Sequence, residues 1–70
     1  MKKKILIEGM SCNHCVNHVK EALSEVNGVT NVEVNLDAKY AIADGNGVAN
    51  EDIKFAIEDA GYEVVGIETL

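Results

Sequence analysis

The chain has 70 residues, of which 47% are hydrophobic, and its formal net charge is −6. This length is that of one domain, residues 1–70, and the composition is that of a globular protein rather than a disordered one. The acidic balance argues against a nucleic-acid partner, and no apolar run approaches the ~20 residues that insertion into a membrane needs.

The start of the chain and its cysteine content bear on the cellular compartment. Lysines at residues 2–4 precede only a short apolar run before Glu8, too short for the apolar region of a signal peptide. We therefore expect a cytoplasmic protein. In a reducing compartment, two cysteines favour metal binding or catalysis over a structural disulfide.

Two elements are predicted in the first part of the chain. Residues 3–8 alternate as a strand with two fairly apolar faces, and Gly9 ends it. Apolar residues then recur every three or four positions between residues 13 and 27, which predicts an amphipathic helix. Asn27 and Gly28 supply a left-handed stop after it.

A pair of strands is predicted next. Residues 32–36 and 40–44 each alternate between apolar and polar side chains, and residues 37–39 form the turn between them. A turn this short makes the two strands antiparallel neighbours.

A second helix and a last strand complete the pattern. Asn50 is expected to cap the helix and Gly61 to end it, and residues 62–68 form the strand, whose alternation breaks at Val64 and Val65. The order βαββαβ predicts an α+β fold, the ferredoxin-like arrangement. In it, right-handed crossovers place both helices on one face of a four-stranded antiparallel sheet.

Both cysteines lie in one segment between the first strand and the first helix. Residues 9–15 read Gly-Met-Ser-Cys-Asn-His-Cys, with Cys12 in the loop and Cys15 in the first helical turn. The N-terminus of a helix carries unpaired N–H groups and the positive end of the dipole, both of which lower the pKa of a thiol. Two thiolates at this spacing can bind one soft metal ion or form a disulfide.

The set of donor atoms favours Cu(I) among the soft ions. Thiolates select soft ions such as Cu(I), and Zn(II) is the common competitor. Zinc takes four ligands in a structural site, or three and a water in a catalytic one. The chain offers two sulfurs and one nearby imidazole, His14, with no second Cys-x-x-Cys pair. A metal ion with so few ligands is open to a partner's thiol, so the site suits transfer.

The motif and the rest of the sequence resemble the heavy-metal-associated domains and, within them, the small bacterial copper chaperones. Residues 9–15 fit the Gly-Met-x-Cys-x-x-Cys pattern of the family, including a His before the second cysteine. The resemblance also takes in residues 27–29, 32–36 and 57–62, so it covers essentially the whole chain. Tyr40 departs from the family pattern, since an aliphatic residue is usual there.

The resemblance implies a cytosolic copper chaperone that is not an enzyme. It implies that Cys12 and Cys15 hold Cu(I), and that the ion passes by thiol exchange to the metal-binding domains of a copper-transporting P-type ATPase. Because such chaperones can form metal-bridged dimers, a metal-bridged homodimer is a further expected partner. Tyr62 matches the tyrosine that bacterial chaperones carry beside the metal loop.

Further residues are expected to support the site, namely Met10, Ser11, His14 and Tyr62. Met10 is interpreted as a core residue that anchors the loop rather than as a ligand. His14 is interpreted as an exposed residue that tunes the thiols, with a role as third metal ligand left open, and Tyr62 is interpreted as a ring that packs against the loop. His18, one turn beyond His14, is expected on the solvated face of the helix.

Two alternatives stay open at this point. The same motif suits a carrier for Hg(II), Cd(II), Ag(I) or Zn(II). A Cys-x-x-Cys pair at a helix N-terminus also suits a thiol–disulfide oxidoreductase. The absence of proline and of a thioredoxin-like element order counts against that enzyme. The periodic strands and helices predict a scaffold that folds without metal, unlike a zinc finger.

Overall fold

Four strands and two helices follow one another in the predicted order. The computed structural model describes residues 2–10 and 13–70. The elements are β1 (Lys2–Glu8), α1 (Asn13–Ser24), β2 (Val29–Asn35), β3 (Tyr40–Gly45), α2 (Asn50–Asp59) and β4 (Glu63–Thr69). Within the described ranges, no helix is long and apolar enough to cross a membrane.

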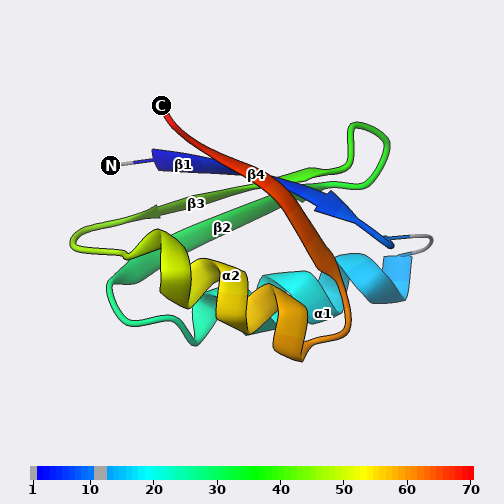
Figure 1. Cartoon of the computed structure of the whole chain (residues 1–70), viewed down its shortest axis with the longest axis horizontal. Helices are drawn as coiled ribbons and strands as arrows, with labels where there is room; N and C mark the ends of the chain where they lie inside the picture. Colours follow the sequence, from blue (N-terminus) through cyan, green and yellow to red (C-terminus); the bar gives the residue numbers. More distant parts are fainter. Residues whose placement is uncertain (1, 11–12) are drawn as a thin grey trace.

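The strands form one antiparallel sheet, and both helices pack on the same face of it (Figure 1). The strand order is β2-β3-β1-β4, so β1 and β3 are central and β2 and β4 are edge strands. This arrangement confirms the predicted ferredoxin-like βαββαβ fold. The end of β1 and the start of α1 lie at the same end of the molecule as the turn from α2 to β4 (Figure 1).

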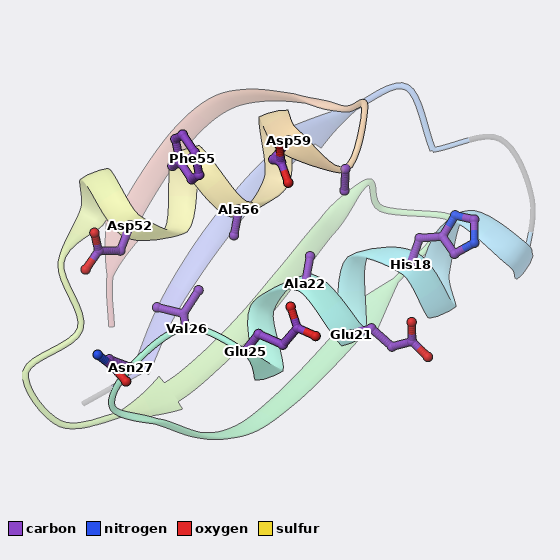
Figure 2. A pocket seen from close by; sticks show the side chains of 11 residues that line it. His18, Glu21, Ala22, Glu25, Val26, Asn27, Asp52, Phe55, Ala56 and Asp59 are labelled. Carbon is purple, nitrogen blue, oxygen red and sulfur yellow. The ribbon is translucent and has the colours of Figure 1, made fainter.

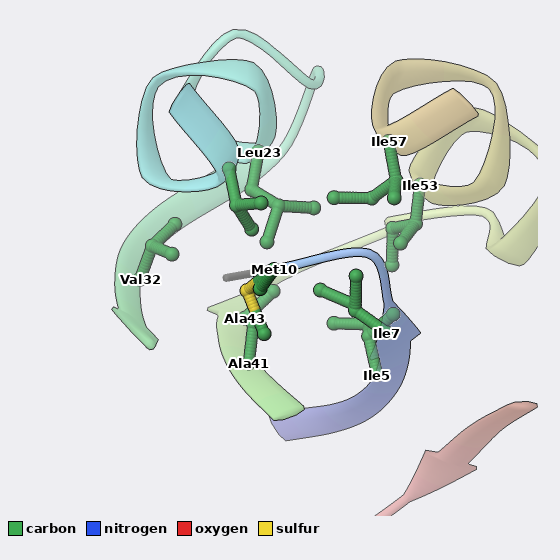
Figure 3. Packing of buried hydrophobic residues seen from close by; sticks show 10 residues of the cluster. Ile5, Ile7, Met10, Leu23, Val32, Ala41, Ala43, Ile53 and Ile57 are labelled. Atoms are coloured by element: carbon green, nitrogen blue, oxygen red, sulfur yellow. The ribbon is translucent and has the colours of Figure 1, made fainter. Parts of the chain in front are cut away.

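The hydrophobic core fills the space between the sheet and the two helices. Alternate residues of the central strands point into it, and each helix contributes one apolar stripe (Figure 3). The buried cluster consists of Ile5, Ile7, Met10, Val19, Leu23, Val32, Ala41, Ala43, Ile53 and Ile57. Since no polar side chain of the described residues is buried, the core is stabilised by apolar burial, at roughly 25 cal/mol per Å².

The face of the sheet away from the helices is open to solvent at its edges and partly apolar at its centre. Leu6 lies opposite Tyr40 and Lys4 opposite Ile42 on the central strands, and all four side chains are half-buried. The Lys4 Nζ lies 4.7 Å from the centre of the Tyr40 ring, a cation–π contact. The unusual Tyr40 is therefore accommodated on the open face and not in the core.

The broken alternation in β4 is caused by a β-bulge. The register between β1 and β4 shifts between Leu6, which pairs with Gly66, and Ile7, which pairs with Val64. Val65 is the extra residue of the bulge and is 60% exposed.

The first helix ends earlier than its apolar spacing predicts. α1 stops at Ser24, and the N–H of Val26 then donates to the carbonyl of Leu23 at 3.1 Å, in a tighter turn. Val26 remains in the core from this turn, which explains why the apolar spacing outlasts the helix. Gly28 has φ +92°, so its left-handed conformation is confirmed, but it lies in the turn before β2, four residues after the end of α1, and the prediction that it stops the helix was wrong.

The second helix begins without the predicted side-chain cap. Ala49 occupies the N-cap position, and the helix starts at Asn50. The carboxamide oxygen of Asn50 instead accepts a 2.6 Å hydrogen bond from the Nζ of Lys3, which also donates to the carbonyl of Val48 at 2.7 Å. The predicted cap was wrong because this charged donor from β1 engages the Asn50 side chain.

Candidate metal site

The segment that carries the cysteine motif begins at Gly9, directly after β1. Gly9 has φ +100°, a left-handed conformation that only glycine adopts at little cost. A Cβ at this position would lie 3.5 Å from the Cδ1 of Tyr62. The left-handed φ is therefore what requires glycine at the end of β1, and the Tyr62 ring lies beside this position at ordinary contact distance.

Met10 anchors the same segment from below. Its side chain is only 8% exposed and belongs to the core cluster, beside Ala41 and Ala43 in Figure 3. The flexible thioether fills an irregular gap under the loop. Its burial agrees with the interpretation of Met10 as a packing residue, and its effect on metal binding stays a prediction.

Cys15 lies in the first turn of α1. Its side chain is half-buried and packs against the core cluster. The first turn of α1 contains no acidic residue, whereas the first turn of α2 contains Glu51 and Asp52. The positive end of the α1 dipole is therefore not offset by a nearby carboxylate of its own helix, and it favours a thiolate at Cys15.

The other predicted site residues stand as follows. Cys12 and Ser11 lie outside the described residues, so their roles stay predictions. His14 is exposed on α1, as expected, and its effect on the thiols also stays a prediction. In the part of the chain that is described, no three His, Cys, Asp or Glu side chains gather into a group that could hold a metal ion.

Tyr62 reaches the loop from the segment that joins α2 to β4. The N–H of Gly61 donates to the carbonyl of Glu58 at 3.0 Å, and that of Tyr62 to the carbonyl of Ile57 at 3.2 Å. These bonds form a Schellman motif, with Gly61 at φ +98° ending α2. The motif fixes the direction in which the chain leaves the helix, and the half-buried Tyr62 side chain thereby packs against the core.

His18 is a residue whose contact the sequence analysis missed. Its Nδ1 lies 3.4 Å from the Tyr62 hydroxyl, so α1 and the start of β4 are joined beside the loop. The expectation that His18 is merely solvated was wrong in this respect, although the side chain is exposed. The position of His18 one helical turn after Cys15 was the available signal that it lies near the loop. That position does not reveal its contact partner, Tyr62, which is distant in sequence.

Known proteins are similar to this chain over nearly its whole length. The heavy-metal-associated domain family matches residues 4–63. The copper chaperone CopZ of Staphylococcus haemolyticus is 50% identical over 66 residues, covering 91% of this chain and 97% of that protein. The structure of a CopZ metallochaperone has a TM-score of 0.88 at 40% identity, over 93% of this chain and 100% of that one.

A domain of a transporter is also similar. A copper-binding domain from HMA7, a P-type ATPase, has a TM-score of 0.84 at 40% identity, over 99% of this chain and 100% of that chain. The ferredoxin-like fold and the matches to these metal-binding proteins place the chain in one class of small domains. The chain belongs to the heavy-metal-associated domain family.

Proposed function

We propose that this protein is a copper chaperone, which binds Cu(I) through the thiolates of Cys12 and Cys15 and passes it to a P-type ATPase. The observation that carries the proposal is the match to a copper chaperone over 91% of the chain, with a Cys-x-x-Cys pair at the start of α1. The packing of Cys15 supports it. A half-buried sulfur above an apolar core holds a soft, weakly hydrated ion without the extra ligands that zinc needs.

Four residues support the metal site in this proposal. Met10 holds the loop to the core, and Ser11, which precedes Cys12 in the sequence, supports the site in this proposal. Tyr62 covers the start of the loop with its ring, which packs at Gly9. His14 is exposed and tunes the thiolates through its charge or a hydrogen bond rather than binding the ion itself.

Delivery proceeds by exchange of ligands at an ion that keeps its oxidation state. A thiolate of the acceptor adds to the two-coordinate Cu(I), and one chaperone thiolate then leaves. A second addition and departure complete the transfer. Only metal–sulfur bonds form and break, so the protein is a carrier and not an enzyme. The likeness to a copper-binding domain of a P-type ATPase supports an acceptor site of the same construction.

The exchange is placed in the cytoplasm because it requires both thiols to be reduced. Oxidation of Cys12 and Cys15 to a disulfide removes both thiolates from the metal. A reducing compartment keeps such a pair as thiols.

A metal-bridged homodimer is the second arrangement in which two thiol pairs can share one ion.

The test is a titration of Cu(I) into reduced protein, without oxygen, against a coloured chelator of known affinity. The wild-type protein is expected to remove Cu(I) from the chelator, and the Cys12→Ser/Cys15→Ser variant is expected not to. Asn17→Ser is the matched control, because it places a serine at an exposed position of the same helix. The control is expected to retain Cu(I) like wild type.

The outcomes separate the alternatives. Retention of Zn(II), Hg(II), Cd(II) or Ag(I) in place of Cu(I) would show that the cargo is a different soft ion. Failure to bind any ion, with turnover in an insulin-reduction assay, would replace the chaperone by a thiol–disulfide oxidoreductase. Mass measurement of the loaded species distinguishes a monomer from a metal-bridged homodimer.

A further inference from the structure

A groove of about 630 Å³ lies between α1 and α2 (Figure 2). Its lining combines small apolar residues with acidic ones. Ala22 of α1, Val26 of the turn after it and Ala56 of α2 form the apolar part, and all three are buried or half-buried. We call this surface the interhelical groove. Its small side chains leave room for a side chain from another molecule.

Four carboxylates surround the interhelical groove. Glu21 comes from α1, Glu25 from the turn directly after it, and Asp52 and Asp59 come from α2 (Figure 2). None of these side chains makes an ion pair or hydrogen bond with another described residue. No lysine lines the groove within the described ranges. The groove therefore carries an uncompensated negative potential that attracts a basic surface and repels an acidic one.

An exposed aromatic ring lies among these carboxylates. Phe55 lines the groove and is 72% exposed. Asp52 and Asp59 lie three residues before it and four after it, so all three share one face of α2. Lys4 covers the ring of Tyr40, but no cation among residues 2–10 and 13–70 covers Phe55.

We propose that the interhelical groove is a docking surface for a basic segment of the copper acceptor, with an arginine of that segment stacked on Phe55. The planar guanidinium can lie on an aromatic face while its N–H groups donate to a carboxylate. Asp52 and Asp59 flank the ring and accept these hydrogen bonds. Glu21 and Glu25 face a second cation of the same segment. The inference rests on the proposed function in taking the acceptor as the occupant.

The interhelical groove lies close to the metal loop, so a partner docked in the groove is held near the site of metal transfer. His18 lines the groove, and its ring also contacts the Tyr62 hydroxyl beside the loop. A segment bound in the groove therefore lies next to the end of the molecule that carries the thiols.

A second copy of this chain is a poor occupant of the same surface. The sequence contains no arginine, and its net charge is −6, so two copies repel each other. Lys3 and Lys4 are also engaged within their own chain, by Asn50 and by Tyr40.

The proposal is tested with a synthetic amphipathic peptide that carries arginines on one face and leucines on the other. The peptide is titrated into reduced, metal-free protein, and binding is followed in ¹H–¹⁵N spectra. Shifts are expected along α1 and α2. Phe55→Ala is expected to weaken binding about fivefold, since both the stacking and the apolar contact are lost. The Asp52→Asn/Asp59→Asn variant is expected to weaken it similarly, and a lysine version of the peptide to bind less tightly than the arginine version.

Val65→Ala is the matched control, because Val65 is an exposed apolar residue of β4 and does not line the groove. This variant is expected to bind the peptide like wild type. Each variant is also tested for Cu(I) retention against the chelator, which is expected to be unchanged. A wild-type protein that does not retain Cu(I) would refute the proposed function, whatever the peptide does.

The docking proposal is overturned if Phe55→Ala binds the arginine peptide as tightly as wild type, or if the shifts lie on the open face of the sheet. It is also overturned if sedimentation shows that wild type forms a dimer and that Phe55→Ala dissolves it, because the occupant would then be a second copy.

Discussion

The two ends of the molecule are held together in different ways. At the metal-loop end, the contacts are made by side chains: Met10 in the core, the Tyr62 ring at Gly9, and the Tyr62 hydroxyl at His18. At the far end, where α1 leads into β2 and β3 leads into α2, the Lys3 side chain donates to the carbonyl of Val48, and in addition the two connections are in direct backbone contact (Figure 1). There the N–H of Asn46 donates to the carbonyl of Gly28 at 3.0 Å.

This difference separates the part that fixes the fold from the part that binds the metal in the proposed function. Backbone segments in direct contact cannot yield without moving whole elements. Side chains can adjust by changing rotamer. A loop held by side chains can follow a change from two to three ligands while the far end keeps the sheet and helices in place.

The largest expected effect comes from adding a methyl group at the far end. In Gly45→Ala, the new Cβ would overlap the carbonyl oxygen of Gly28, a backbone atom, so the two segments must separate. We expect the free energy of unfolding to fall by about 3 kcal/mol or more. Urea denaturation of the reduced, metal-free protein measures this loss.

Gly66→Ala is the matched control for that experiment. Gly66 is also a strand glycine, but its Cβ would meet only the Cδ1 of Leu6, at an ordinary 3.7 Å. Its unfolding free energy is expected to stay within about 0.5 kcal/mol of wild type. Equal losses in Gly45→Ala and Gly66→Ala would show that the backbone contact at the far end has no special role.

An intermediate loss of stability is expected from a substitution at Met10, which lies in the metal-loop end of the molecule. Met10→Ala removes a buried side chain from the core cluster and is expected to cost about 2 kcal/mol, measured by urea denaturation. Because the loop loses its anchor, Cu(I) retention against the chelator is also expected to fall. Met10→Leu keeps the volume and is expected to restore both properties. A leucine variant that is stable but loses Cu(I) would mean that the thioether is itself a ligand.

The fold was largely predictable because its signals are local. The alternation in β1 to β3 and the three-and-four spacing in both helices depend on residues close in sequence, and they predicted the right element order. The glycine stop at Gly61 was also a local signal, whereas Gly28 has the predicted left-handed φ but lies four residues after the end of α1. The end of α1 was missed because Val26 packs into the core from a turn, which leaves the same apolar spacing as a longer helix.

The contacts that were missed all join residues distant in sequence. Asn50 was predicted to cap α2, but Lys3 of β1 engages it. His18 was predicted to be solvated, but Tyr62 contacts it. A sequence read without its tertiary partners predicts the local preference of a polar side chain, and a distant donor or acceptor can override that preference. The Cys-x-x-Cys motif was predictable because both thiols lie within one turn of each other.

The smallest expected effect isolates the polar contact at the metal-loop end. The hydroxyl of Tyr62 and the Nδ1 of His18 are 3.4 Å apart at an exposed position, so their coupling should be about 0.5 kcal/mol. A double-mutant cycle of Tyr62→Phe and His18→Ala, read by urea denaturation, measures this coupling free of the ring's packing. A second cycle of Tyr62→Phe with Asn17→Ala uses an exposed neighbour on the same helix and should give no coupling. If both cycles give the same value, the ring alone holds the loop. If only the His18 cycle shows coupling, the metal-loop end contains a side-chain hydrogen bond that can break during transfer. The backbone contacts of the far end would stay in place.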